Sequence, residues 1–582
     1  MSNWNLSKLY TSINDEKFIK DQKTLTELIT KINEYTKELN NEDINNKLIN
    51  TLKLMEEYTV LVEKLSSFLS LSLTTDTTNK EVTSAKEILY GVINQASKPM
   101  AVINLWIKDL DFNEIDFNNS YLKEYTFMLN EIKDGGKYLL SDGQEEVISK
   151  LRMNGSSKWS DLQEYLTSIL SIELNGKEYN LPSIRNMAYD SDPKVRKEAY
   201  YAELESYKQI KEPLAFSLNS IKGEANTIAE LRGYESVLDM TLINSRLKKE
   251  TLDAMLEAIK DALPAFRKYL RRKAELLGYE NGLPFYDMFA PMGHSDKRFT
   301  IEESKDYLIN SFKETPKIAE LIKEAYENDW IDFLPKNGKV GGAFCSNLTS
   351  IKESRILTNF DGSLSDVVTL AHELGHAYHG YCIQNHLPLN TDYSMPVAET
   401  ASIFNETIVM NKVISESKSK EEKILLLESS LQDSTQVIVD ILSRYIFETN
   451  VVNKRKDGFM FADELSEMML EAQKEAYGDG LDHSLLHPYM WVNKGHYYSA
   501  GLNFYNFPYA FGLLFAKGLY SIYEVEKESF LNKYDSLLEA TTVNNVEEVA
   551  KIANVDLTNK EFWTNSINII VRQIEEFIEI TK

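Results

Sequence analysis

The chain has 582 residues, of which 43% are hydrophobic and 26% are charged. This composition is typical of a folded globular protein, and the length predicts more than one sub-domain. The formal net charge of −25 argues against nucleic acid as a partner, because proteins that bind it need Lys and Arg to displace counterions from phosphates. Only Cys345 and Cys382 could pair, so we expect reduced thiols and no disulfide framework.

Helical periodicity dominates the chain. Apolar residues recur every three or four positions in residues 16–39, 46–71, 80–107 and 247–277, which predicts amphipathic helices. No apolar run is long enough to span a membrane, and the N-terminus lacks the basic and apolar stretches of a signal peptide. We therefore expect a mainly α fold, no membrane partner and a cytoplasmic location.

Two segments interrupt the helical pattern. Residues 173–181 contain Asn175-Gly176, which predicts a β-hairpin. A new helix is expected to begin near Pro193, so we place a division between an N-terminal helical region, residues 1–195, and a second region, residues 196–582. The second interruption, residues 337–360, contains NGKVGGAFCSNL and RILTNF. It predicts short strands that form a small sheet beside the next helix.

That next helix, residues 363–383, carries the sequence HELGH. Asp361 or Ser363 can cap its start. On a helix, positions i and i+4 point the same way, so His372 and His376 can share one zinc ion. Glu373 follows the first histidine, where it can act as general base and then as general acid. Gly375 costs the helix about 1 kcal/mol relative to alanine, which close approach of a substrate or a neighbouring backbone would explain.

A catalytic zinc ion needs a third protein ligand and an open position. The best candidate is Glu399 in the segment MPVAETASIFNET. Ser394 can cap a helix there, Pro396 is tolerated in its first turn, and Glu399 is then expected one turn into the helix. Glu406, two turns further on, suits an acceptor for a histidine N–H. The alternative for Glu399 is an ordinary first-turn glutamate favoured by the helix dipole.

Several segments in a fixed order carry a family resemblance. They are HELGH and VAETASIFNE together with DPKVRKEAYYAE, RGYESVLD, PFYDMFAPM, GGAFC and HYYSAGLNFYNFPYAFG. With them, the chain resembles the thimet-oligopeptidase family of zinc metallopeptidases, and most of all its oligoendopeptidase F branch. The resemblance extends over nearly the whole chain.

The resemblance implies a two-lobed helical clam with a deep central channel, a zinc ion at the channel floor and a small β-sheet next to the HExxH helix. It also implies Glu399 as the third zinc ligand. Gly341, Gly342, Ala343 and Phe344 correspond to a strand that pairs with the extended substrate backbone. A narrow channel admits flexible peptides and excludes folded proteins.

The C-terminal segment would supply the remaining chemistry. The resemblance implies that His496 and a tyrosine approach the substrate and its developing oxyanion. The spacing differs from that of the thimet branch, so the tyrosine is Tyr505 or Tyr509, with Tyr498 less favoured. Most of the 32 tyrosines serve packing. His379, one turn beyond His376, is expected to support the metal site or line the cleft, with plain solvation as the alternative.

Together these features predict an endopeptidase with one Zn²⁺ per chain that cleaves short oligopeptides. A metallo-carboxypeptidase of similar architecture is the second candidate. It would need an Arg or Lys clamp for a terminal carboxylate, and no local motif identifies one. A third candidate is a non-catalytic helical peptide-binding or scaffold protein, which would not require zinc.

Overall fold

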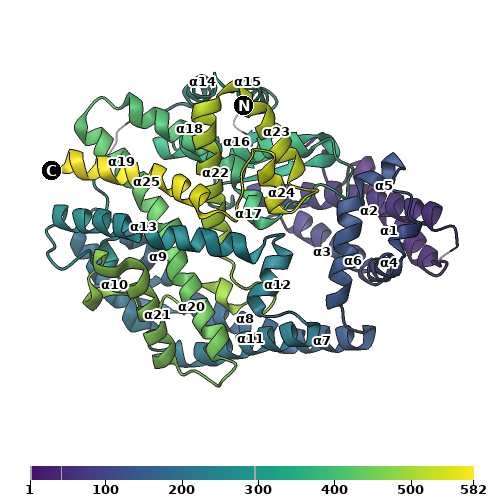
Figure 1. Ribbon diagram of the computed structural model, residues 1–582, viewed down its shortest axis with the longest axis horizontal. Coiled ribbons are helices and arrows are strands. Elements are labelled where there is room, and N and C mark those ends of the chain that lie inside the picture. The colour runs from purple at the N-terminus through teal and green to yellow at the C-terminus, as the bar shows by residue number, and fades with distance from the viewer. Residues whose placement is uncertain (1–2, 41, 294–296) are drawn as a thin grey trace.

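The computed structural model describes residues 3–40, 42–293 and 297–582, and the fold is mainly α-helical, as predicted (Figure 1). The N-terminal helices gather at one end of the molecule, drawn in purple and blue. Among the described residues, no helix combines the length and the apolar character that a bilayer span requires. The N-terminal helices are α1 (Glu16–Thr36), α2 (Ile44–Thr75), α3 (Lys80–Asn94), α4 (Ser97–Asp109), α5 (Ser120–Glu124) and α6 (Thr126–Gly135).

The predicted helix over residues 80–107 is two helices, α3 and α4, so its continuity was wrong. Pro99 lies in the first turn of α4 and has no backbone N–H to donate to the carbonyl of Gln95. The backbone hydrogen bonds of the helix are therefore interrupted here, although the apolar residues keep their helical spacing across the break. The other predicted helices lie where the periodicity placed them, in α1, α2 and α13 (Lys249–Leu276).

The remaining helices form the larger part of the molecule. In Figure 1, α13 and the C-terminal helix α25 run side by side across it, and they are in contact. In chain order the others are α7 (Asp142–Asn154), α8 (Ser156–Ser168), α9 (Leu181–Asn186), α10 (Pro193–Tyr207), α11 (Lys211–Arg232), α12 (Val237–Asn244), α14 (Ile301–Ser311), α15 (Pro316–Glu327), α16 (Leu364–Ile383), α17 (Met395–Ala398), α18 (Thr400–Glu416), α19 (Lys420–Thr435), α20 (Ile441–Lys454), α21 (Ala462–Tyr477), α22 (Phe507–Glu526), α23 (Glu528–Ala540), α24 (Val546–Lys551) and α25 (Lys560–Thr581).

The predicted hairpin is present. Strands β1 (Ser171–Leu174) and β2 (Lys177–Asn180) pair antiparallel. Asn175 and Gly176 have φ values of 53° and 74°, so both turn residues are left-handed, as a tight two-residue hairpin turn requires.

The second sheet has the strand order β3-β5-β4. Strand β4 (Phe344–Leu348) pairs antiparallel with β5 (Glu353–Leu357), and β3 (Ile331–Asp332) pairs parallel with β5 on its other side. The sequence pattern predicted β4 and β5, whereas β3 is too short to show alternation. Both β4 and β5 contact α16, so the small sheet lies beside the HExxH helix, as expected.

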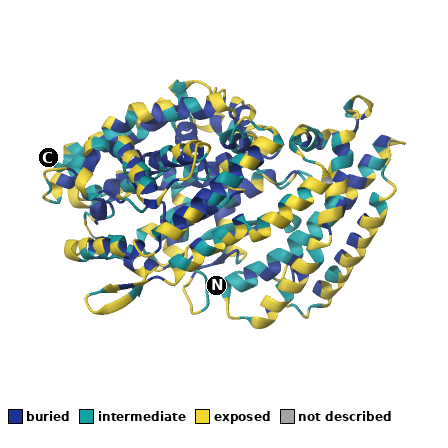
Figure 2. Cartoon of the chain, turned by 90° about the horizontal axis from the view of Figure 1, so that it is seen from below, coloured by how far each residue is buried: buried dark blue, intermediate teal, exposed yellow. Residues whose placement is uncertain are grey.

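Three apolar clusters form the core. The largest extends from Leu170 to Phe577, and two smaller ones lie mainly among the N-terminal helices. Figure 2 shows the buried residues concentrated in the central helices, with exposed residues on the outward faces. Ile172 and Ile184 of the hairpin region belong to the large cluster, so this region packs with residues beyond 195. The domain division at residue 195 stays a prediction.

Candidate active site

The start of α16 is fixed by a capping box. Ser363 is the N-cap residue, and its Oγ accepts a hydrogen bond from the backbone N–H of Asp366 at 3.2 Å. The Asp366 carboxylate in turn accepts from the backbone N–H groups of Asp361, Gly362 and Ser363, at 2.8, 3.0 and 3.1 Å. Of the two predicted caps, Ser363 therefore occupies the position, and the helix that carries the histidines begins at a defined residue.

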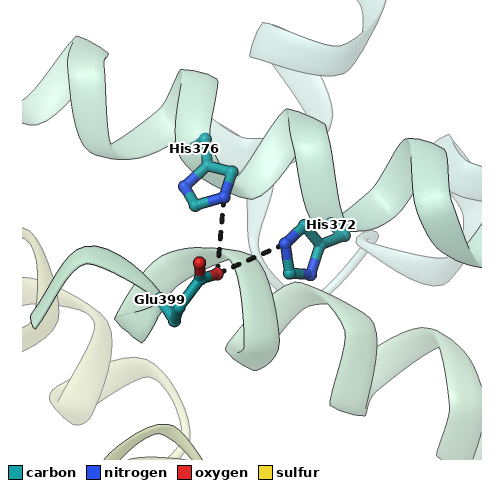
Figure 3. Close-up of side chains that lie close together, drawn as sticks. All are labelled: His372, His376 and Glu399. Atoms are coloured by element: carbon teal, nitrogen blue, oxygen red, sulfur yellow. Dashed lines mark ion pairs between the residues drawn. The ribbon is translucent and has the colours of Figure 1, made fainter. Parts of the chain in front are cut away.

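Three of the predicted site residues converge on one point. The rings of His372 and His376 lie 5.0 Å apart on one side of α16. Their Nε2 atoms lie 3.3 and 3.4 Å from Oε2 of Glu399 (Figure 3). One ligand atom from each residue lies within 4.8 Å of the other two. The structure therefore brings together the two imidazoles and the carboxylate that the sequence pointed to.

The local backbone of Glu399 differs from the prediction. Glu399 lies between α17 and α18, with φ −91° and ψ 6°, and not one turn inside a single helix. Ser394 does occupy the N-cap position, but its side chain makes no capping hydrogen bond. A helix interior restricts the direction of each side chain, and a residue at a junction between two helices escapes this restriction. The break between α17 and α18 falls at Glu399, so its carboxylate can turn towards α16.

Close backbone packing sets the spacing of the three residues. A Cβ atom at Gly375 would lie 2.5 Å from the carbonyl oxygen of Ala401 and from Cα of Ser402. Of the two expected causes for this glycine, the neighbouring backbone is the one found. A Cβ atom at Gly512 of α22 would lie 2.8 Å from Cβ of Glu399. Both glycines let helices approach closely on either side of the cluster.

This donor set fits a zinc ion. Bonds of about 2.0–2.1 Å in a tetrahedral arrangement place neighbouring donor atoms about 3.4 Å apart, which matches the two observed separations. Nδ1 of His372 lies 3.2 Å from Oε2 of Glu406, so a proton on Nδ1 leaves the Nε2 lone pair facing Glu399. Ser402 Oγ donates to Oε2 of Glu399 at 2.7 Å and holds that carboxylate in place.

The pKa values of the three residues indicate that the cluster favours a positive charge at its centre. Burial lowers the pKa of His372, but hydrogen bonds to Glu399 and Glu406 outweigh it and raise the pKa to about 10. Burial lowers the pKa of His376 to about 4. Burial raises the pKa of Glu399, but the two imidazoles outweigh this effect and lower the pKa to about 2. A divalent cation at the centre would replace the proton that His372 holds towards Glu399.

Glu373 is a protonatable group beside this cluster. Only 6% of its surface is exposed, and burial raises its pKa to about 7. The thiol of Cys345 on β4 lies near enough that, after burial, Glu373 is the next cause of its raised pKa. Strand β4 therefore runs close to Glu373. A carboxyl group with a pKa near neutrality is suited to accept and return a proton.

The predicted substrate strand lies at the edge of the sheet. Gly341 and Gly342 are exposed, whereas Ala343 and Phe344 are half-buried. Within the described residues β4 pairs only with β5, which leaves its other edge without a strand partner. Asn347 Nδ2 donates to the carbonyl oxygen of His376 at 3.2 Å and ties β4 to α16.

The C-terminal candidates differ in position. Tyr509 lines a cavity of about 650 Å³ together with His372, Glu399 and Glu406. The described lining of this cavity does not include Tyr505, whose hydroxyl is hydrogen-bonded to that of Tyr509.

His496 contacts one of these two tyrosines and is not part of the described lining of the cavity. Its ring stacks on Tyr505 with centroids 5.9 Å apart, and its Nε2 lies 2.7 Å from Nδ2 of Asn506. Tyr498 is buried, and its hydroxyl has no partner among the described residues.

His379 does not belong to the group of three ligand atoms in the described structure. It is fully buried; its Nε2 lies 2.8 Å from Oγ1 of Thr541, and its ring stacks on Tyr393 with centroids 4.1 Å apart. Its contacts connect α16 to the segment after α23.

No sequence pattern points to the buried ion pair that supports the tyrosine segment. Lys222 Nζ donates to Glu448 at 2.7 Å and to Asn503 at 2.9 Å. Glu448 also accepts from the backbone N–H of Phe504, which has a left-handed φ of 53°. Lys222 is 226 residues from Glu448 and 281 from Asn503, so only the folded chain brings them together.

Comparison with known proteins identifies a peptidase family. The model described as "Peptidase family M3" matches residues 186–569, and the model described as "Oligopeptidase F" matches residues 107–171. Oligopeptidase PepF of Bacillus subtilis is 24% identical, over 99% of this chain and 87% of its own length. An oligoendopeptidase F homolog of Borreliella burgdorferi is 26% identical, over 99% and 98%.

Solved structures show the same fold. The oligoendopeptidase-F of Enterococcus faecium has a TM-score of 0.72 at 19% identity, over 97% of this chain and 99% of its own. A candidate peptidase from Chlamydophila abortus has a TM-score of 0.84 at 21% identity, over 100% and 98%. At these identities the structures establish the fold alone. The family model covers well over half of the chain, and the chain belongs to peptidase family M3.

Proposed function

We propose that this peptidase is a zinc-dependent endopeptidase that hydrolyses internal bonds of short oligopeptides. One observation carries the proposal: the ligand atoms of His372, His376 and Glu399 converge within 4.8 Å. Glu373, which is buried and can hold a proton, stands next to the first of them.

The roles of the residues follow from their positions. Zinc held by the three ligands would polarise the scissile carbonyl and make water more acidic. Glu373 takes the proton of the attacking water and later returns it to the leaving amine. Tyr509, on the wall of the same cavity, donates its hydroxyl to the developing oxyanion, while Tyr505 and His496 hold it in position.

The free edge of β4 offers a place for the extended peptide. Backbone groups of residues 341–344 would pair with the substrate main chain, which provides affinity with little sequence preference. Phe344 and its neighbours run beside α16, so a peptide on this edge passes close to Glu373.

The substitution Glu373→Gln tests the role of the base. Glutamine keeps the shape of the side chain but cannot accept the proton, so turnover of an internally quenched peptide should fall about 10³-fold. Zinc content, measured by elemental analysis, should stay at one ion per chain. Glu421→Gln, at an exposed position of α19, is the matched control. Substantial cleavage by Glu373→Gln, or by metal-free wild type, contradicts the proposal.

Mass spectrometry of the products separates an endopeptidase from a carboxypeptidase. Cleavage at an internal bond should yield two peptides from each substrate. Stepwise release of single C-terminal residues would instead support the carboxypeptidase.

A further inference from the structure

A second cavity adjoins the one at the metal centre. It has a volume of about 750 Å³, and Asp433 lines both cavities. At the π-helical turn that follows α19, Gln436 lines the second cavity and Val437 the first. Asp433, Gln436 and Val437 therefore lie where the two cavities border each other.

The walls of the second cavity carry three cations, and one of them is fully engaged. Arg196 Nε donates to Asp287 at 2.7 Å, and its Nη1 donates to the carbonyl oxygens of Asp190 and Ser191 at 2.7 and 3.1 Å. Both Arg196 and Asp287 are buried, so this pair is part of the scaffold.

The other two cations are Arg185 and Lys494. Among the described residues, Arg185 has one ion-pair contact, from Nε to Oε1 of Glu203 at 3.5 Å, and the terminal nitrogens of its guanidinium group make no hydrogen bond or ion pair there. The same cavity is also lined by the carboxyl groups of Glu164, Glu203 and Asp433. Of these, only Glu203 forms an ion pair with Arg185 among the described residues.

Within the part of the chain that the structure describes, the backbone carbonyl of Lys494 accepts a hydrogen bond from the N–H of Tyr497 at 3.1 Å. Its ammonium group makes neither a hydrogen bond nor an ion pair there, although the charges of Asp440 and Glu203 act to raise its pKa.

An enclosed lysine without a partner is costly. Burial, followed by repulsion from Arg444, lowers the pKa of Lys494 to about 7. An uncompensated charge away from water destabilises the fold, and a lysine in this position gives up part of its charge instead. An anionic ligand at this point would relieve that cost, and a bidentate carboxylate also matches the planar donors of Arg185.

We propose that Arg185 and Lys494 make this cavity a subsite that binds a carboxylate of the peptide substrate. The subsite rests on the proposed function, since the remainder of the peptide must lie in the cavity of the metal centre. The carboxylate is the C-terminal group or an acidic side chain. Because the cations stand in a separate cavity beyond Asp433, the bound carboxylate is remote from the metal, and the bond that is cleaved is internal.

The experiment tests three quenched peptides with the zinc-loaded enzyme, and the first two have the same sequence. The first ends in a free carboxylate, the second in an amide, and the third in an amide after a C-terminal glutamate. Wild type should cleave the first with a kcat/KM about tenfold above the second. Lys494→Met and Arg185→Met should each reduce this ratio towards one, chiefly through KM. Lys208→Met, an exposed lysine on the outer surface, should keep the wild-type ratio.

The third peptide separates the two sources of the carboxylate. Restored cleavage shows that a side chain suffices, and continued weak cleavage shows that the terminal group is required; either result supports the subsite. Equal cleavage of all three peptides by wild type, or an unchanged ratio in both variants, overturns it. Failure of the proposed function is a different result, in which wild type cleaves no peptide in a metal-dependent way. Circular dichroism and the melting temperature report whether each variant is folded.

Discussion

His372 is held through both of its ring nitrogens. Nδ1 faces Glu406 at 3.2 Å, and Nε2 faces Glu399 at 3.3 Å. The first contact fixes the tautomer and the orientation of the ring, and the second places the ring at the metal position. If the proposed zinc site is correct, Glu406 would control how well His372 binds the metal without binding it itself.

We expect Glu406→Ala to weaken zinc binding about 10–100-fold, because the imidazole loses the acceptor that orients it. Competition with a chromophoric chelator measures the dissociation constant. Glu416→Ala is the control, since Glu416 lies on the same helix, α18, at its exposed end. An unchanged zinc affinity in Glu406→Ala would show that the contact does not orient the ring.

Asp433 gives a pH-dependent prediction. Burial, followed by the nearby charges of Glu406 and Glu428, raises its pKa to about 7, whereas an aspartate in an unfolded chain titrates near pH 4. Between these values the folded state binds the additional proton, so Asp433 makes folding less favourable as pH rises through this range.

Asp433→Asn removes this penalty. The variant should gain no stability over wild type near pH 4, and its gain should grow through pH 7 and then level off. Urea unfolding at pH 4.5, 6 and 8 measures the difference, with Asp457→Asn in an exposed segment as the control. A gain of equal size at all three pH values would mean that the carboxyl is not protonated on folding.

At the level of elements, the site depends on contact between α16 and α18. Gly375→Ala would place a methyl group against the backbone of Ala401 and Ser402, where no flexible side chain can yield. We expect a loss of about 1–3 kcal/mol in unfolding free energy from overpacking, together with weaker zinc binding as the helices separate.

Gly91→Ala is the matched control for Gly375→Ala. It lies inside α3, and a Cβ atom there meets nothing within 4 Å. This variant should be more stable by about 0.5–1 kcal/mol, because alanine restricts the unfolded chain without a clash. Denaturant unfolding measures the unfolding free energy of both variants. Equal changes in the two would show that close packing at Gly375 does not determine stability.

Patterns within one or two helical turns could be predicted from sequence. The histidine spacing, the cap at Ser363 and the Asn175-Gly176 turn depend on neighbouring residues, and the structure agrees with each. The interruption at Glu399 and the split before Pro99 could not be predicted from apolar periodicity, because it does not register backbone breaks. Arg185 and Lys494 line one cavity although they are about 300 positions apart in the sequence. Only the tertiary fold brings them together, so the sequence could not predict this cavity.

For the molecule as a whole, the proposed function implies that the two adjoining cavities would limit which substrates can reach the metal centre. Their volumes of about 650 and 750 Å³ suit an extended chain of a few residues and are far too small for a folded domain. The proposed pairing along the edge of β4 would also require a substrate whose backbone is free to pair.

We therefore expect a cleavable sequence to be resistant when it lies within a stably folded domain. The same sequence as a free peptide should be hydrolysed, and a peptide released from the domain by prior digestion should be hydrolysed as well. Mass spectrometry of timed samples measures the three cases. Cleavage of the intact folded domain at a rate comparable with that of the peptide would contradict size exclusion.

Strand β4 also belongs to two parts of the molecule at once. Its backbone pairs with β5 beside α16, whereas Leu348 is buried in one of the N-terminal clusters and the ring of Phe344 packs on Trp4 at 6.2 Å. Deleting the first helices would expose these apolar side chains on the very strand that borders Glu373. The amino-terminal segment is thus an integral part of the fold, because it packs against the strand on which a peptide would bind.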